Sequence, residues 1–356
     1  MTTLNHDQAR IRGAWQGRIS GCMLGKPIEV LSMRKGHEAL TAYLEEASAL
    51  PLRDYVPFNE REPLVAPSKA CCRQWMTRSE PDDDIHYSVL ALMMLERHGR
   101  DLSTAHVAQS WLRNLPAAAT YTAERAAYRI LLTKGDEWFA ERGEPGFDLA
   151  ECADNPYNDW IGAQIRADVY GWVAPGDPEL AARLATADAA LSHRGDGMGG
   201  AVFVAVAGSQ IPVCASLDEA VERTLPFLES SSGAREAVEL GIACRNDPEG
   251  GAQIRARYAN LSPVHTLNNL AIVVWSLLSH PDDFGAAIGD AVAAGLDTDC
   301  NGATVGGLWG LQGKPIPDPW LEPWQGRVGV NLAGQRELSL DDLAARTLSV
   351  MESLRA

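Results

Sequence analysis

The sequence predicts an all-α protein with a single domain over residues 1–356. Apolar residues recur at three- and four-residue intervals along much of the chain, as a helix with one buried face requires. Long alternating runs of Val, Ile and Thr, which would indicate strands, are scarce. No Gly/Ser-rich linker and no internal repeat divides the chain, so one domain is the simplest interpretation.

The helical pattern is carried by residues 8–24, 84–97, 103–112, 179–191, 216–228, 234–245 and 340–354. Ser216 precedes Glu219, and Ser339 precedes Asp342, at the spacing by which polar side chains cap a helix N-terminus. Residues 201–207 are the most strand-like run. The Gly and Ala residues on both sides of this run favour a closely packed helix instead.

The irregular segments are residues 51–78, 134–159 and 313–327. Each is rich in Pro, aromatic and charged residues, and none has the composition of a flexible linker. We therefore expect ordered loops over a functional site. Trp309, Trp320 and Trp324 lie in or beside the last segment, and they either wall such a site or pack in the core.

Composition excludes several classes of function. The formal net charge of -16 repels phosphate backbones, so we expect no nucleic-acid partner. The 7 Cys are odd in number and irregularly spaced, which indicates neither a disulfide framework nor a zinc knuckle. Residues 1–12 lack the apolar core of a signal peptide, and the most apolar run is too short to span a bilayer. We expect a soluble, cytoplasmic protein without a membrane partner.

An acidic cluster, Asp82-Asp83-Asp84, follows a proline at the start of a predicted helix. Carboxylates at such a position accept unpaired backbone N–H groups and interact favourably with the helix dipole, by about 0.3–1 kcal/mol each. Asp282-Asp283 at another predicted helix start has this ordinary explanation, and we assign it no function. Three consecutive carboxylates also repel one another, and a divalent cation would relieve that repulsion. Capping and metal binding both remain open for this cluster.

A second acidic motif, Asp297-x-Asp299, lies near the end of the chain. In an extended or turn segment, a D-x-D pair directs both carboxylates the same way, which suits one hard cation or a bridged pair. The later ligand positions of an EF-hand loop are missing. Alternatively, Asp299 caps a helix that packs closely through Gly302, Gly306 and Gly307. Both interpretations can hold together, because a helix N-terminus can present metal ligands.

These motifs carry a family resemblance. D-D-D-x-x-Y at residues 82–87 and G-x-D-T-D-x-x-G-A at residues 295–303 resemble the two metal-binding motifs of the ADP-ribosylglycohydrolase family. Residues 10–29 are similar to the family's opening helix, residues 162–166 to its G-A-x-x-R element, and residues 192–200 to its S-H…G segment. The five segments follow the family's order and extend over roughly residues 8–312.

The resemblance implies an orthogonal bundle of helices around a cleft for a ribosyl group, with two Mg²⁺ or Mn²⁺ ions between the acidic motifs. The implied metal ligands are Asp82, Asp83, Asp84, Asp297, Asp299 and Cys300. Glu29 and Asp83 are the implied catalytic residues, which align or deprotonate a water molecule.

Two positions depart from the family pattern. In the register that we prefer, Asp82 stands where the family usually has Thr; the alternative register puts Pro81 at that position. Cys300 stands where the family usually has Thr or Ser, and a thiol is a poor ligand for Mg²⁺. An extra carboxylate and a lost hydroxyl would change the charge of the metal site.

Substrate contacts are predicted at Asn155, Asn158, Arg166, His193, Gly197 and Gly199. The glycines do not form a dinucleotide fingerprint, because no strand precedes them. Arg166 is equally well explained by a substrate phosphate or a structural carboxylate. From the residues alone, His193 is better explained as a half-buried, satisfied histidine. Trp160, beside the two asparagines, either stacks a base or anchors a loop.

The leading hypothesis is metal-dependent hydrolysis of a ribosyl bond, in which a metal-activated water removes ADP-ribose from a modified protein side chain or conjugate. The first alternative keeps the fold and the metals but takes a smaller N- or O-riboside, such as a nucleoside or metabolite. The departures from the family pattern motivate this alternative. The second is a non-catalytic ADP-ribose binder, in which we would expect the acidic ligands to be eroded.

Overall fold

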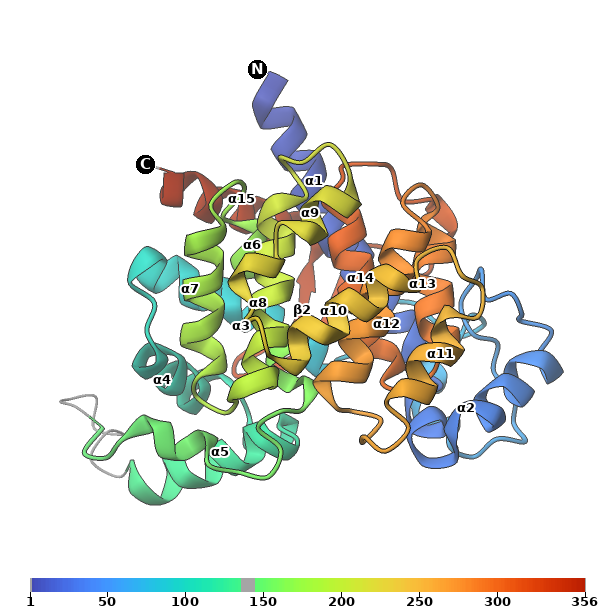
Figure 1. The fold of residues 1–356 in the computed structure, drawn as a ribbon, viewed down its shortest axis with the longest axis horizontal. Coiled ribbons are helices and arrows are strands. Elements are labelled where there is room, and N and C mark those ends of the chain that lie inside the picture. The colour runs from blue at the N-terminus through green and yellow to red at the C-terminus, as the bar shows by residue number, and fades with distance from the viewer. Residues whose placement is uncertain (1, 136–144, 356) are drawn as a thin grey trace.

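The computed structural model describes residues 2–135 and 145–355, and this part of the chain is built of helices (Figure 1). The α-helices are α1 (Thr2–Gly25), α2 (Glu29–Glu46), α3 (Asp83–His98), α4 (Thr104–Asn114), α5 (Thr122–Lys134), α6 (Asp168–Trp172), α7 (Pro178–Ala189), α8 (Gly195–Gln210), α9 (Leu217–Glu222), α10 (Gly233–Ala243), α11 (Gly250–Arg257), α12 (Thr266–Ser279), α13 (Phe284–Ala293), α14 (Thr298–Gly310) and α15 (Leu340–Arg355). β1 (Arg327–Leu332) pairs with β2 (Gln335–Ser339) in an antiparallel hairpin. The predicted all-α class is confirmed.

The predicted helical segments correspond to α1, α3, α4, α7, α9, α10 and α15, with small shifts of their bounds. The strand-like run at residues 201–207 lies in the middle of helix α8, as expected. The segment 216–228 forms a shorter helix than predicted. It divides into α9 and the 3₁₀ helix η7 (Leu225–Phe227), because Pro226 lacks the N–H that would continue an α-helix.

Helix capping follows the sequence pattern. Ser216 accepts the backbone N–H of Glu219 at 3.1 Å, and Ser339 accepts that of Asp342 at the same distance. Asp283, at the helix start to which we assigned no function, caps α13 by accepting the N–H of Ala286 at 2.9 Å. An acidic helix start in this chain therefore does not by itself indicate a functional site.

The hairpin β1–β2 is among the elements that the sequence analysis did not predict, as are the helices α2, α5, α6, α11 and α12. Its first strand alternates the buried side chains of Val328, Val330 and Leu332, which is the usual pattern of a half-buried strand. The hairpin also contacts the first acidic motif, since the backbone N–H of Asn331 donates to Nε2 of His86 at 2.9 Å. It therefore helps to fix the beginning of α3.

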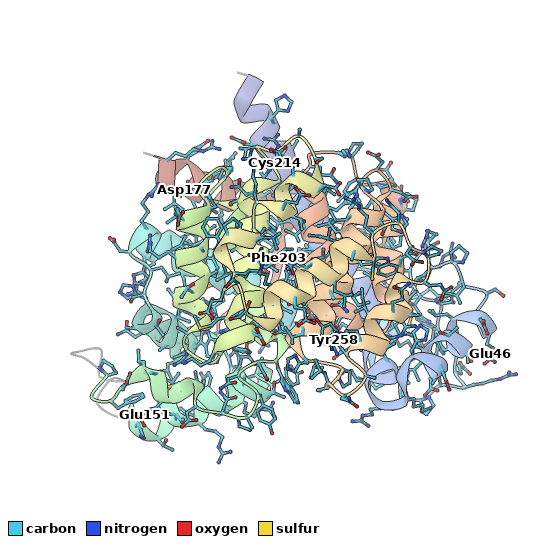
Figure 2. All side chains as sticks on the ribbon, in the orientation of Figure 1. Glu46, Glu151, Asp177, Phe203, Cys214 and Tyr258 are labelled. Atoms are coloured by element: carbon cyan, nitrogen blue, oxygen red, sulfur yellow. The ribbon has the colours of Figure 1, made fainter. Side chains whose placement is uncertain are left out.

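The helices surround a continuous buried core. Phe203 of α8 is fully buried and lies near the centre of the view in Figure 2, whereas Glu46 lies at its outer edge on α2. Trp309, Trp320 and Trp324 are buried and pack in this core, so packing is the correct explanation for them. No helix among the described residues has the length and apolar character needed to cross a bilayer.

Helices α1 and α14, from opposite ends of the chain, run antiparallel with their backbones in contact. The facing glycines are Gly13, Gly17 and Gly21 of α1 and Gly310, Gly306 and Gly302 of α14. A Cβ atom on Gly17 would lie 1.9 Å from the carbonyl oxygen of Gly306, and one on Gly306 would lie 2.1 Å from that of Gly17. Only residues without a Cβ allow this approach.

This contact predicts that Gly17→Ala lowers the free energy of unfolding by at least about 1–3 kcal/mol, because the added methyl group forces two backbones apart. Urea denaturation measures the change. Gly208→Ala is the matched control in another helix interior, where the nearest atoms would lie 3.4 Å from the new Cβ. We expect the control to be neutral or slightly stabilising. Equal stabilities of the two variants would contradict the proposed role of the contact.

Candidate metal centre and cleft

Three helices begin at one place and bring the two acidic motifs together with Glu29. Glu29 is the first residue of α2, and Asp83 is the first residue of α3. Asp297 immediately precedes α14, and Asp299 lies in its first turn. The D-x-D motif is therefore a helix start rather than an extended segment. Because helix N-termini carry partial positive charge, all three ends favour carboxylates.

The carboxylates and two thiols form three overlapping groups with the spacing of metal ligands. In each group, the candidate ligand atoms lie within 4.8 Å of one another. The first contains Glu29, Asp297 and Asp299, and the second contains Asp84, Asp299 and Cys300. Asp299 belongs to both of these groups, and Asp84 belongs to the second and to the third, with Cys22 and Asp82.

Three of these residues have a buried carboxylate oxygen without a hydrogen-bond partner in the described part of the chain. The atoms are Oδ2 of Asp84, Oδ1 of Asp297 and Oδ1 of Asp299. An unpaired charged group in such a place is costly. Divalent cations such as Mg²⁺ and Mn²⁺ bind carboxylate oxygens, so the residues present fit a metal centre.

Burial and mutual repulsion raise the pKa of these carboxyl groups. Burial is the larger cause for Asp83, Asp84 and Asp297, whose pKa values lie well above 3.8, and neighbouring aspartates raise them further. The pKa of Glu29 is raised by burial and then by the charges of Asp299 and Asp297. Cations close to the cluster would favour the charged form of these groups.

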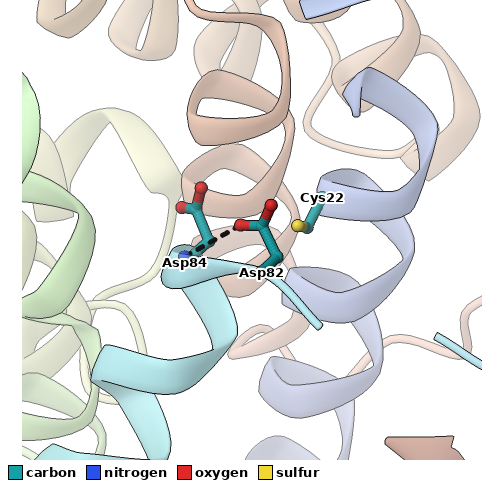
Figure 3. Close-up of side chains that lie close together, drawn as sticks. All are labelled: Cys22, Asp82 and Asp84. Carbon is teal, nitrogen blue, oxygen red and sulfur yellow. Dashed lines mark hydrogen bonds between the residues drawn. The ribbon is translucent and has the colours of Figure 1, made fainter. Parts of the chain in front are cut away.

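Asp82 differs from the other acids, because both of its oxygens have partners. Oδ1 accepts the N–H of Asp84 at 2.9 Å, the capping bond drawn in Figure 3, and Oδ2 pairs with Nζ of Lys26. Burial raises the pKa of Asp82, but the charge and hydrogen bond of Lys26 outweigh it and bring the pKa to about 2. Asp82 therefore caps α3, as one of the two interpretations predicted.

Two cysteine thiols lie among the acids. The Sγ of Cys22 lies within 4.8 Å of oxygens of Asp82 and Asp84, and Figure 3 shows it beside these carboxylates. Burial, followed by the nearby negative charges, raises the pKa of both Cys22 and Cys300 well above its ordinary value. Both thiols are thus uncharged, and a neutral thiol is a weak ligand for a hard cation.

A buried arginine holds Asp84 in place from behind. Nη2 of Arg18 lies 3.1 Å from Oδ1 of Asp84, and Nη1 lies 2.7 Å from Oδ2 of Asp168. All three side chains are fully buried. Arg18 also donates from Nε to the backbone oxygen of Asp84 at 3.0 Å. One oxygen of Asp84 is thereby anchored, while Oδ2 remains available to a cation.

The acidic cluster forms one side of a cleft with two lobes. The first lobe has a volume of about 400 Å³ and combines Glu29, Asp83, Asp297 and Asp299 with an apolar wall that includes Trp160. The second has a volume of about 370 Å³ and extends over the hairpin toward Arg336 and Asn331. The lobes share Lys26, Asp82, Asp83 and Tyr121. Both volumes are in the range of small-molecule sites.

Another hollow, of about 530 Å³ and thus larger than either lobe, lies over α11 and α12. It is lined by none of the residues that the sequence analysis assigned to the site. Its side chains include His37, Arg255 and Trp275, but no set of converging carboxylates. Size alone therefore does not identify the site, and the chemistry of the lining residues favours the smaller cleft.

The family model of the ADP-ribosylglycohydrolases matches residues 3–353, nearly the whole chain. The chain belongs to the ADP-ribosylglycohydrolase family. The solved structure described as "ADP-ribosylglycohydrolase-related protein complex" has a similar fold, with a TM-score of 0.62 and 19% sequence identity. The similarity covers 98% of this chain and 99% of the solved one. No curated protein matches the chain in sequence.

Membership of the family makes the protein a glycosidic-bond hydrolase. Members act on ADP-ribosylated substrates and generally depend on divalent metals, and this chain has acidic clusters that could bind such metals.

Arg166 and His193, two of the predicted substrate contacts, do not line the cleft. The Arg166 side chain is 1% exposed, and it forms ion pairs with Glu124 at 2.8 Å and with Asp188 at 2.5 Å. His193 is fully buried, and its Nδ1 lies 2.8 Å from Oγ of Ser192. In this structure, a structural carboxylate is the partner of Arg166, and His193 is a core histidine.

None of the other predicted contacts lines either lobe of the cleft. The side chains of Asn155 and Asn158 donate to backbone carbonyl oxygens at 3.0 Å and 3.1 Å. A Cβ on Gly197 would lie 2.4 Å from the backbone oxygen of Asn158, and one on Gly199 would lie 2.6 Å from the Cβ of Ala234. In this structure both glycines serve close packing.

Several cleft residues were absent from the sequence-based prediction: Lys26, Val30, Met33, Tyr121, Glu124, Ile161 and Val264. Lys26 could have been found, because it lies in the opening motif three residues before Glu29. Tyr121 is 56% exposed at the mouth of the cleft. It precedes α5 in a segment without any recognisable motif, so nothing in the sequence indicated it.

The burial of Asp297 beside other carboxylates leads to a prediction for Asp297→Asn. The folded-state pKa of Asp297 lies above the unfolded value of about 3.9, so the folded chain binds more protons between these values and loses stability as pH rises. At pH 7 in EDTA, the variant should melt a few degrees higher than the native protein. Below about pH 4 the advantage should disappear.

With Mn²⁺ the order should reverse, because the variant lacks a ligand and gains less stability from binding. Differential scanning calorimetry at both pH values measures the effect. Asp282→Asn is the control, since that carboxylate also lies at a helix start but is largely exposed. A native protein whose melting temperature is unchanged by Mn²⁺ would refute the metal centre.

Proposed function

We propose that this protein removes ADP-ribose from a modified side chain or conjugate by divalent-metal-dependent hydrolysis of the ribosyl bond. The observation that carries the proposal is a pair of buried, unpartnered carboxylate oxygens, from Asp297 and Asp299, in residues that line a cleft. Asp84, which also has an unpartnered oxygen, forms a ligand group with Asp299. The sharing of Asp299 by two ligand groups supports two ions, Mg²⁺ or Mn²⁺.

The proposed ligands are Glu29, Asp83, Asp84, Asp297 and Asp299, with Cys300 beside them as a neutral group. Divalent cations in this place would supply Lewis acidity, orient ribose hydroxyls and lower the pKa of water. Arg18 fixes Asp84, and the N–H of Asp297 is fixed by Oδ1 of Asn269 at 3.2 Å. The ligand set is therefore held on rigid helix ends before any substrate enters.

Glu29 and Asp83 are the proposed acid–base residues. Both carboxylates face the first lobe, where a water molecule could approach the ribosyl C1′ atom. The positive charge of Lys26 beside them lowers the pKa of both groups and partly offsets the effect of burial. With cations adding to this effect, each group could be charged at neutral pH and could accept a proton from water.

The two lobes support a substrate with groups on both sides of the scissile bond. Asp83 lies where they meet, so a ribose at this residue could extend one substituent into each lobe. The apolar wall with Trp160 suits a base, and the second lobe with Arg336 and Lys26 suits a polar group. A simple riboside would use only part of this space.

Activity measurements test the proposal. We expect the protein to release ADP-ribose from ADP-ribosyl-arginine, to lose this activity in EDTA and to regain it with Mg²⁺ or Mn²⁺. Glu29→Gln and Asp83→Asn should lower kcat by about 10²–10⁴-fold, the usual contribution of general acid–base catalysis. The control is Asp282→Asn, which should retain full turnover.

Indifference to EDTA would refute the proposal. A higher kcat/KM on a nucleoside than on ADP-ribosyl-arginine would instead favour the alternative of a small riboside. Tight binding of ADP-ribose without turnover of either substrate would identify a non-catalytic binder.

A further inference from the structure

Lys26 is, with Arg18, a cation that the chain itself supplies to the acidic centre. It directly follows α1, and its backbone N–H donates to the carbonyl oxygen of Cys22 at 2.9 Å. The negative end of the α1 dipole therefore favours a positive charge at this position. Only 20% of the side chain is exposed, and its Nζ pairs with Oδ2 of Asp82, which is itself buried.

The partners of Asp82 separate it from the other acids. Its two oxygens are taken by Lys26 and by the N–H of Asp84, whereas the oxygens of Asp297 and Asp299 that lack partners are free to bind a cation. Lys26 and Asp82 together carry no net charge. The remaining carboxylates, Glu29 among them, carry the charge that divalent cations would neutralise.

We propose that Lys26 neutralises Asp82 and withdraws it from the metal-ligand set, so that the pair fixes how strongly the centre binds divalent cations. This inference rests on the proposed metal-dependent function. Lys26 is a positioning residue, since it acts through Asp82. The pair also explains how this chain tolerates a carboxylate at the first position of the Asp82-Asp83-Asp84 cluster.

The proposal predicts opposite effects of the two single substitutions. In Lys26→Met, Asp82 loses its counter-ion and adds a negative charge beside Asp84 and Cys22, so Mn²⁺ should bind more tightly. In Asp82→Asn, the cap of α3 is kept, but the freed ammonium group lies beside Glu29 and Asp299 and should weaken Mn²⁺ binding. Each change should be on the order of tenfold in Kd, since one charge is altered a few ångströms from the ions.

The double variant Lys26→Met/Asp82→Asn should return to the native Kd within about threefold, because it removes both charges together. Isothermal titration of the metal-free protein with MnCl₂ measures all four Kd values without any assay of turnover. Lys35→Met is the matched control, since Lys35 pairs with Glu62 at 2.8 Å on the exposed surface. This control should leave the Kd unchanged.

Three results are decisive. Failure of the native protein to bind Mn²⁺ refutes the proposed function, and the inference with it. If the native protein binds Mn²⁺ but the double variant binds as weakly as Asp82→Asn, Asp82 is itself a ligand and only the inference fails. Unchanged Kd values in both single variants also overturn the inference alone. Lys26→Gln replaces Lys26→Met if circular dichroism shows that the methionine variant is unfolded.

Discussion

The backbone contact between α1 and α14 is the constraint on which the rest of the structure depends. It continues to the end of α1, where a Cβ on Gly25 would lie 2.3 Å from the backbone N of Asp299. The hydroxyl of Thr298 donates to the carbonyl oxygen of Gly25 at 2.9 Å and fixes the register. Lys26 and Glu29 therefore emerge beside the D-x-D motif, although they lie near the opposite end of the chain.

The second constraint is electrostatic. A helix N-terminus stabilises a carboxylate by roughly 0.3–1 kcal/mol, whereas an uncompensated buried charge costs several kcal/mol. The helix ends at Glu29, Asp83 and Asp297 cannot offset this cost alone. Within the acidic cluster, Arg18 compensates Asp84 and Lys26 compensates Asp82. The unpartnered oxygens of Asp297 and Asp299 remain, and divalent cations are the species whose charge and ligand preference suit them.

Much of the fold could be predicted, because a helix can be recognised from its own residues. Apolar residues recur every three or four positions, and capping residues mark its start. The two acidic motifs could also be identified, since each is contiguous in sequence. The residues that contact these motifs, in contrast, come from distant parts of the sequence. From the sequence, Arg166 is a candidate for binding a substrate phosphate. Its actual partners, Glu124 and Asp188, are distant in sequence and are known only from the folded structure. The hairpin at β1 was missed because one short strand carries too little pattern against many helices.

The reaction residues and the substrate-binding residues of the site come from different parts of the fold. The residues proposed for the reaction, such as Glu29 and Asp299, lie at helix starts that the α1–α14 contact holds together, and they form recognisable motifs. Some residues that line the rest of the cleft, such as Tyr121 and Trp160, come from connecting segments between helices. Such segments can change without disturbing the core. The chemistry of this site is thus tied to the fold, whereas the substrate depends on side chains that the fold leaves free to vary.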